Sequence, residues 1–223
     1  MLLTSGGISN PSLKQALIRL LPKPIEACHA VGISTASFSL TNGLTLAASF
    51  YQGKSSTPMV AFPWASFGVL ELSVLPFVNK EQWYEQLNKV DVLLINGGDP
   101  ALLLEVIRAS GLLSYLETHE KVIVGLSAGS MIWTPNLGHD FVDEQHECGL
   151  GWVPFSIFPH LNYPGFTENT LVRAKAWAKT IPNDAYAMDD QTGILVNDQH
   201  VEVISEGEWY AFPQPHQRKK DNP

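Results

Sequence analysis

Residues 121–133 read Lys-Val-Ile-Val-Gly-Leu-Ser-Ala-Gly-Ser-Met-Ile-Trp, and this stretch decides the fold class. Its first six residues form an apolar run without strict alternation, which is typical of a strand buried on both faces of a parallel sheet. The residues that follow Ser127 have helical spacing until Pro135, which stops the helix. The stretch therefore predicts one strand, turn and helix of an α/β protein.

A second unit of the same kind lies directly upstream. An apolar run over residues 91–95 ends at the turn sequence Asn-Gly-Gly-Asp-Pro of residues 96–100, and apolar residues then recur at helical spacing as far as Leu113. Two adjacent units predict a doubly wound, mostly parallel sheet flanked by helices. We expect a single domain over residues 1–215, followed by a polar tail over residues 216–223.

Shorter patterns predict further elements on both sides of this centre. Residues 11–21 are expected to form a helix that starts at Asn10 or Ser12, and residues 166–181 also have helical spacing. Residues 34–67 have mixed periodicity and predict no element. Short strands are expected at residues 1–5, 68–74, 153–159, 185–188, 193–196 and 201–204.

The composition argues against several classes of function. The chain has 223 residues, of which 45% are hydrophobic and 16% charged, so it can bury one large core. A net charge of −8 and a pI near 5.3 disfavour a nucleic-acid partner. The N-terminus lacks signal-peptide character and no apolar run approaches the roughly 20 residues that cross a bilayer, so we expect a cytoplasmic protein without a membrane partner. Cys28 and Cys148 are too few for a disulfide framework.

The segment Gly125-Leu126-Ser127-Ala128-Gly129 matches the G-x-S-x-G pattern of a nucleophile elbow. A serine hydroxyl attacks a carbonyl only when it projects from the backbone and a base removes its proton. A sharp turn from strand to helix provides the projection, and glycines on both sides avoid crowding in that turn. Ser127 is therefore the candidate nucleophile, and the alternative is a glycine-rich turn without a catalytic role.

The order of the chain also suggests the other parts of such a site. The backbone N–H of Ala128 is a natural donor to an oxyanion, and the Gly97-Gly98 loop opens at the same edge of the sheet, so Gly98 is the second candidate donor. Of the seven histidines, His160 directly follows an expected strand and is the candidate base, although a lone histidine is often structural.

Taken together, these segments resemble the dipeptidase E family of serine peptidases. The resemblance rests on N-G-G-D-P-A-L-L-L at residues 96–104, G-L-S-A-G-S at residues 125–130 and F-P-H at residues 158–160, in matching order and spacing. It implies a class I glutamine-amidotransferase-like (flavodoxin-like) three-layer sandwich, with Ser127 as nucleophile, His160 as base, and Gly98 and Ala128 as oxyanion donors. His160 lies only 33 residues after Ser127, which argues against an ordinary α/β-hydrolase, where the histidine comes late in the chain.

The resemblance places the acid of the triad between the serine and the histidine, where Asp140 is the closest match. An acid there would orient the imidazole and stabilise its charged form. The same loop also holds Asp143, Glu144 and Glu147, and a solvated acidic loop is the alternative interpretation.

Two further residues are candidates for substrate binding. Arg173 lies roughly where the family has an arginine, and a guanidinium suits a carboxylate, although a surface arginine is the alternative. Asp99 departs from the family's Gly-Asn-Thr sequence and would repel an acidic substrate. An alternative role for Asp99, or for Asp189 or Asp190, is to bind a free α-amine.

The sequence therefore predicts a serine peptidase that hydrolyses short peptides, Asp-X dipeptides among them, through an acyl-enzyme formed by a Ser127, His160 and Asp140 triad. Alternatives are a hydrolase of another ester or amide and a non-catalytic binding module on the same fold. No metal or organic cofactor is expected, because the chain has no CxxC or HExxH spacing and no phosphate-cradling loop. The expected partner is a small peptide substrate; a homodimer is compatible with the sequence, which does not decide the oligomeric state.

Overall fold

The computed structural model describes residues 1–56, 58–198 and 200–214, and the polar tail expected at residues 216–223 lies outside these ranges. A seven-stranded sheet forms its centre, with five parallel strands followed by two antiparallel strands at one edge. In spatial order the strands are β3 (Ser66–Val69), β2 (His29–Ile33), β4 (Val92–Ile95), β5 (Val122–Leu126), β1 (Leu2–Thr4), β8 (Thr192–Asn197) and β9 (His200–Ser205). The prediction of a doubly wound, mostly parallel α/β sheet is confirmed.

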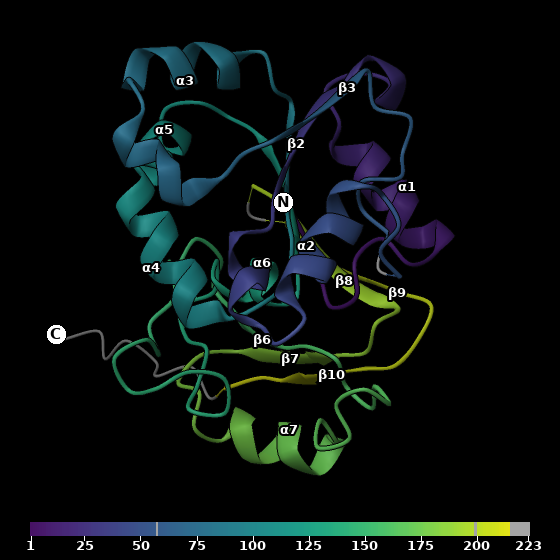
Figure 1. Ribbon diagram of the computed structural model, residues 1–223. Coiled ribbons are helices and arrows are strands. Elements are labelled where there is room, and N and C mark those ends of the chain that lie inside the picture. The colour runs from purple at the N-terminus through teal and green to yellow at the C-terminus, as the bar shows by residue number, and fades with distance from the viewer. Residues whose placement is uncertain (57, 199, 215–223) are drawn as a thin grey trace, which may run out of the picture.

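Helices lie on both faces of this sheet (Figure 1). One face carries α1 (Pro11–Leu20) and α2 (Gly43–Tyr51), and the other carries α3 (Lys80–Asn88), α4 (Pro100–Ser110) and α5 (Leu112–Leu116). The short helix α6 (Ala128–Met131) follows β5 directly, and α7 (Leu171–Ala178) lies apart from the other helices. Three 3₁₀ turns complete the helical elements: η1 (Ile25–Ala27), η2 (Thr35–Ser39) and η3 (Leu72–Phe77). None of the described helices is long and apolar enough to span a membrane.

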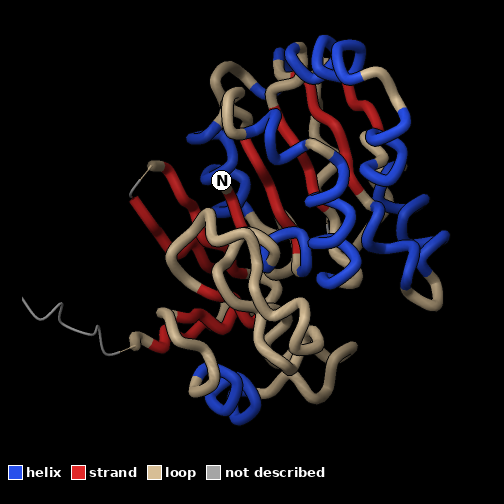
Figure 2. Tube along the Cα trace, turned by 90° about the vertical axis from the view of Figure 1, so that its left-hand side faces the viewer, coloured by secondary structure: helices blue, strands red, loops and turns tan. Residues whose placement is uncertain are grey.

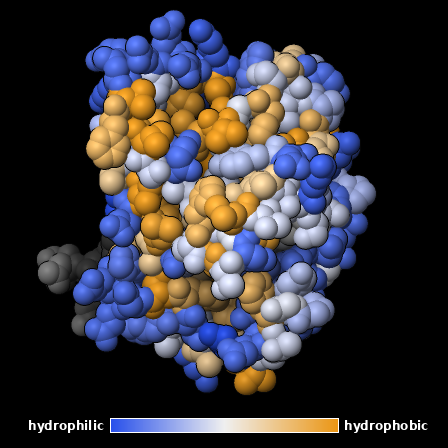
Figure 3. Space-filling view, viewed as in Figure 1, coloured by the Kyte–Doolittle hydropathy of each residue, from blue (hydrophilic) through white to orange (hydrophobic). Residues whose placement is uncertain are grey.

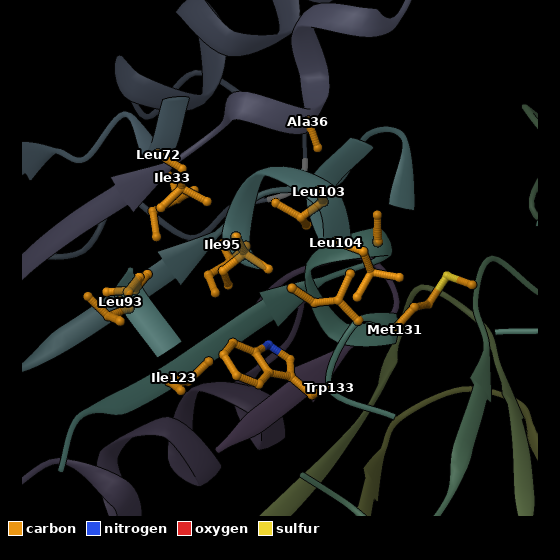
Figure 4. Packing of buried hydrophobic residues seen from close by; sticks show 14 of the residues in the cluster. Ile33, Ala36, Leu72, Leu93, Ile95, Leu103, Leu104, Ile123, Met131 and Trp133 are labelled. Atoms are coloured by element: carbon orange, nitrogen blue, oxygen red, sulfur yellow. The ribbon is translucent and has the colours of Figure 1, made fainter. Parts of the chain in front are cut away.

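The central strands are buried on both faces, which explains why their apolar runs do not alternate. In β4, Leu93 and Ile95 belong to one core cluster, whereas Val92 and Leu94 belong to the cluster on the opposite face. Figure 4 shows the first of these clusters, with Ile95 drawn between Leu93 and Leu103 of α4. Complete burial of such a side chain contributes roughly 1.5–3 kcal/mol, so the strands of the centre are the most strongly stabilised part of the fold.

A second sheet of three strands packs below the carboxyl ends of the parallel strands (Figures 1 and 2). Its order is β10 (Trp209–Phe212), β7 (Ala185–Met188) and β6 (Ser156–Phe158), and β6 runs parallel to β7. Helix α7 covers this sheet through the buried residues Ala174 and Trp177. The small sheet therefore has its own apolar cluster and its own carboxyl edge.

Most of the predicted elements are present with small changes of boundary. The helix expected at residues 166–181 is shorter, because Thr170 caps α7 by accepting a hydrogen bond from the N–H of Arg173 over 3.3 Å. The strand expected at residues 68–74 ends at Val69, and its remainder forms η3.

Four of the described α-helices and β-strands were not predicted, namely β2, α2, α3 and β10, and neither were the turns η1 and η2. The sequence of α2 begins with glycine and contains serine and threonine, which are weak helix formers. Burial of Ala47, and of Phe50 in the core cluster that it shares with strand residues, stabilises this helix instead. Tertiary packing, rather than local propensity, therefore determines structure in this part of the chain.

Candidate active site

Ser127 occupies the sharp turn between β5 and α6. Its backbone has φ 52° and ψ −118°, a conformation that costs a non-glycine residue of order 1–3 kcal/mol. Hydrogen bonds hold the turn: the Ser127 N–H donates to the carbonyl oxygen of Thr4 over 3.1 Å, and the N–H of Ser130 donates to the Ser127 carbonyl over 2.8 Å. This turn places Ser127 on the wall of a cavity of about 730 Å³.

Close backbone contacts explain the two glycines on either side of Ser127. A Cβ on Gly125 would lie 2.4 Å from the carbonyl oxygen of Gly129, and a Cβ on Gly129 would lie 2.3 Å from that of Ile95. Both distances are far inside van der Waals contact, so only glycine fits at either position. The expectation that side chains would crowd this turn is confirmed.

The imidazole of His160 lies between the hydroxyl of Ser127 and the carboxylate of Asp190. His160 Nε2 is 2.8 Å from Ser127 Oγ, and Nδ1 is 2.7 Å from Asp190 Oδ1. The His160 side chain is only 12% exposed. When Asp190 is ionised, Nδ1–H donates to it and Nε2 is left to accept the proton of Ser127. The structure thus places the candidate nucleophile Ser127 and the candidate base His160 within hydrogen-bond distance of each other.

The acid beside His160 is Asp190, and this corrects the sequence-based choice of Asp140. Strands β6 and β7 are parallel neighbours, with Phe158 paired to Ala187. His160 lies two positions beyond Phe158 and Asp190 lies three positions beyond Ala187, so both side chains leave the same edge of the small sheet. The sequence marks Asp190 only as an acid that closely follows a short expected strand, and it does not specify that this strand pairs with β6.

Ser5 connects this arrangement to the large sheet. The backbone N–H of His160 donates to Ser5 Oγ over 2.7 Å, and Ser5 Oγ lies 3.0 Å from Asp190 Oδ1. Ser5 directly follows β1, just as Ser127 directly follows the neighbouring strand β5. Sequence reasoning missed Ser5, which holds both the backbone of His160 and the carboxylate of Asp190.

The Gly97-Gly98 loop lies beside Ser127, as expected. A Cβ on Gly97 would be 3.1 Å from the Cβ of Ser127, and Gly98 has φ 143° and packs against the backbone of Ala36. Ser37 of η2 donates from its Oγ to the carbonyl oxygen of Gly97 over 2.8 Å. Gly98 and Ala128 both line the cavity, and neither backbone N–H has a hydrogen-bond partner within the described ranges.

Asp140 lines the same cavity but pairs with Arg173. Arg173 Nε donates to Asp140 Oδ1 over 3.0 Å, and Arg173 Nη1 donates to Glu168 Oε2 over 3.1 Å. The side chains of Asp140 and Arg173 are both about one-third exposed, at 31% and 30%. Two of the other acids in this loop form ion pairs outside the cavity wall: Asp143 pairs with His146, and Glu147 pairs with His139.

Asp99 is a helix cap rather than part of the cavity wall, which corrects its expected role in substrate binding. Its Oδ1 accepts hydrogen bonds from the N–H groups of Ala101 and Leu102 over 2.8 and 3.1 Å at the start of α4. Of the residues that the structure describes, those lining the cavity include Asp190 but not Asp99. Asp189 similarly accepts hydrogen bonds from Thr192 and from the N–H of Glu208. Both carboxylates already have local partners.

The described residues contain no group of three or more His, Cys, Asp or Glu side chains placed to hold a metal ion. The groups that the cavity wall offers for chemistry include a serine hydroxyl, an imidazole, a carboxylate and backbone N–H groups.

Comparison with known proteins gives a family and two structural relatives. The sequence model of peptidase family S51 matches residues 62–204. A crystal structure of a protein from Listeria monocytogenes EGD-e, provisionally assigned as a peptidase E, is similar with a TM-score of 0.66 and 20% identity, over 92% of this chain and 98% of that one. A peptidase from an acI-B1 actinobacterium has a TM-score of 0.65 and 16% identity, over 93% of this chain and 88% of that one. No curated protein matches the sequence.

Proposed function

The chain belongs to peptidase family S51, the dipeptidase E family of serine peptidases, and we propose that it hydrolyses short peptides by nucleophilic attack of Ser127. The observation that carries this proposal is the continuous line of hydrogen bonds from Ser127 Oγ through His160 to Asp190, at 2.8 and 2.7 Å. This arrangement is the one that activates a serine in unrelated hydrolases.

The mechanism follows from the positions of these atoms. His160 Nε2 takes the proton of the Ser127 hydroxyl while Oγ attacks the scissile carbonyl carbon, and Asp190 stabilises the imidazolium that forms. The N–H groups of Gly98 and Ala128 donate to the developing oxyanion. The imidazolium returns its proton to the leaving amine, the C–N bond breaks, and an acyl-enzyme remains on Ser127. Water then attacks the ester carbonyl carbon with His160 again as base, the bond between that carbon and Ser127 Oγ breaks, and the imidazolium returns the proton to Oγ as the carboxylic acid leaves.

Short peptides are the proposed substrates because the cavity is bounded. It holds about 730 Å³, which lies within the roughly 300–1,000 Å³ that is typical of small-molecule sites. The resemblance to dipeptidase E makes dipeptides the first class to test, Asp-X dipeptides included. We also propose a cytoplasmic location and a small peptide as the partner.

Release of free amino acids from a dipeptide library tests the proposal directly. We expect the wild-type protein to release them and Ser127→Ala to be at least about 10³-fold slower, because the nucleophile is absent. Ser130→Ala is the matched control, since it removes a buried hydroxyl three residues away that donates to the carbonyl oxygen of Thr4.

Labelling with a fluorophosphonate probe separates the alternatives. Labelling of wild type and Ser130→Ala but not of Ser127→Ala, without release from any dipeptide, would favour hydrolysis of another ester or amide. Absence of both labelling and release would contradict the enzyme mechanism and favour a binding module.

A further inference from the structure

We propose, on the premise that the function above holds, that Asp140 is a specificity-determining residue. By occupying Arg173 it keeps acidic side chains out of the cavity, which instead takes short peptides with uncharged, apolar side chains. Both residues line the cavity that also contains Ser127 and His160.

All three nitrogen atoms of the Arg173 guanidinium are already engaged. Nε donates to Asp140 Oδ1 over 3.0 Å, Nη2 donates to the backbone carbonyl oxygen of Asp140 over 3.4 Å, and Nη1 donates to Glu168 Oε2 over 3.1 Å. The Nε position of the guanidinium fork, which a substrate carboxylate would use, is therefore filled by a carboxylate of the chain itself. The side chain of Glu168 is 84% exposed, against 31% for that of Asp140, so Glu168 contributes less to holding Arg173.

The charges around the cavity do not favour an anion. Among the described lining residues, the acidic, basic and histidine side chains are Asp140, Arg173, His160 and Asp190. His160 and Asp190 are committed to Ser127, and Asp140 neutralises Arg173. A second carboxylate placed near Arg173 would be repelled by Asp140 without finding a free cation, and the net charge of −8 adds to that repulsion.

The wall beside the imidazole is aromatic. The ring of Phe166 lies 5.0 Å from that of His160, and the ring of Tyr163 lies 5.9 Å away. Phe166 and Tyr163 are 51% and 42% exposed, so they offer apolar surface to a bound molecule. The space-filling view shows a hollow with apolar residues at its base between α2 and α7 (Figure 3). Because His160 must give its proton to the leaving amine, the leaving residue of the substrate lies beside these two rings.

The opposite role for Asp140 is to orient Arg173 toward an acidic substrate. The two roles predict opposite effects of removing the carboxylate, so one pair of substrates separates them. Asp-Leu and Asn-Leu have nearly the same shape and differ by one negative charge. The ratio of their kcat/KM values therefore measures how strongly the site favours or disfavours that charge.

We expect wild type to have an Asp-Leu to Asn-Leu ratio below one and to cleave Leu-Leu at least about tenfold better than Asp-Leu. Asp140→Asn should raise the ratio at least about tenfold, since it removes the repulsion and frees Arg173. The matched control is Asp143→Asn, the same change in the same loop at a side chain that is 66% exposed and pairs with His146 outside the cavity wall. The control should change the ratio less than about twofold.

A wild-type ratio above one, or an Asp140→Asn ratio that is unchanged or lower, would overturn the proposal. The Asp-Leu to Asn-Leu ratio of wild type tests the proposal even if the variant does not fold. If Asp140→Asn does not fold, Asp140→Ser takes its place. The dissociation constants of Asp-Leu and Asn-Leu on Ser127→Ala, with and without Asp140→Asn, give the same comparison without catalysis. If no dipeptide is hydrolysed, the proposed peptidase function is wrong, but the dissociation constants still decide the role of Asp140. If neither dipeptide binds, the proposal for Asp140 is wrong as well.

Discussion

The two sheets of the molecule contribute to the site in different ways. The large sheet supplies Ser127 and the Gly97-Gly98 loop from adjacent parallel strands, β5 and β4, which are buried on both faces. The small sheet supplies His160 and Asp190 from strands of three and four residues, β6 and β7. In both cases parallel pairing aligns residues that follow the strand ends, but only the large sheet has a deep core on both sides.

Each sheet therefore presents one strained residue at the interface between the sheets: Ser127 follows β5 with φ 52°, and His160 follows β6 with φ 58°. Ser127 comes from the more deeply packed strand and carries the hydroxyl. The small sheet holds a base and an acid that act through side-chain hydrogen bonds. Ser5, at the end of β1, bridges the two sheets by contacting both His160 and Asp190.

Among these predictions, the largest loss of activity is expected for Asp190→Asn in the small sheet. We expect kcat to fall about 10³–10⁴-fold, because the amide neither selects the tautomer of His160 nor stabilises its cation. Asp140→Asn, measured on Leu-Leu, should lower kcat less than about tenfold, since its carboxylate contacts Arg173 rather than His160. Steady-state kinetics of both variants give the comparison. Equal losses would mean that the acid of the small sheet has no special role.

A smaller effect is expected for Gly98→Ala in the loop of the large sheet. The new Cβ would lie 2.3 Å from the backbone of Ala36 at a φ of 143°, so we expect a loss of about 3 kcal/mol in the free energy of unfolding. Gly151→Ala is the control, because its φ of 68° is also left-handed but no atom lies within 4 Å of the new Cβ. That change should cost about 1 kcal/mol. Urea denaturation measures both, and similar losses would show that strain, not the contact with Ala36, dominates.

Ser5→Ala tests the bridge between the sheets. We expect kcat to fall about tenfold with little change in KM, because His160 and Asp190 lose a shared hydrogen-bond partner but the cavity keeps its lining. Ser9→Ala is matched to it, since Ser9 Oγ donates only to the backbone carbonyl oxygen of Asp190, over 2.6 Å. The kcat of Ser9→Ala should be closer to that of wild type, and Ser5→Thr should be more active than Ser5→Ala. A change in KM alone would contradict a positioning role for Ser5.

The smallest effect is expected at the far end of the large sheet, where Asp91 precedes β4. Burial opposes its ionisation, but a hydrogen bond from the N–H of His29 and the ion pair with Lys23 lower the pKa of Asp91 below its ordinary value. The contribution of Asp91 to the free energy of unfolding is therefore fully present above the ordinary carboxyl pKa, and it is lost as pH falls through the lowered pKa. Asp91→Asn should lower the free energy of unfolding by about 1 kcal/mol at pH 7.

Chemical denaturation at pH 7 and near pH 3 checks this prediction. The difference between wild type and Asp91→Asn should shrink at the lower pH while activity at pH 7 is retained. A difference that grows on acidification would have the wrong sign for a lowered pKa.

Much of the large sheet could be predicted because its signals are local. The apolar runs of β4 and β5, the glycines beside Ser127 and the cap at Asn10 act within a few residues of where they occur. The Asn10 side chain accepts from the N–H of Leu13 over 2.9 Å, as a helix start requires. By contrast, α2 and β2 depend on neighbours far away in the chain and gave no clear pattern.

The sequence by itself determined the strand, turn and helix around Ser127, and it identified His160 through the expected strand that precedes it. Only the tertiary structure decided that Asp190 and not Asp140 meets His160, that Ser5 supports both, and that Arg173 is occupied. The physical reason is the range of the interactions. Chain connectivity enforces a tight turn, whereas the pairing of β6 with β7 brings together two residues that lie 30 positions apart. No periodicity in either segment specifies that partner.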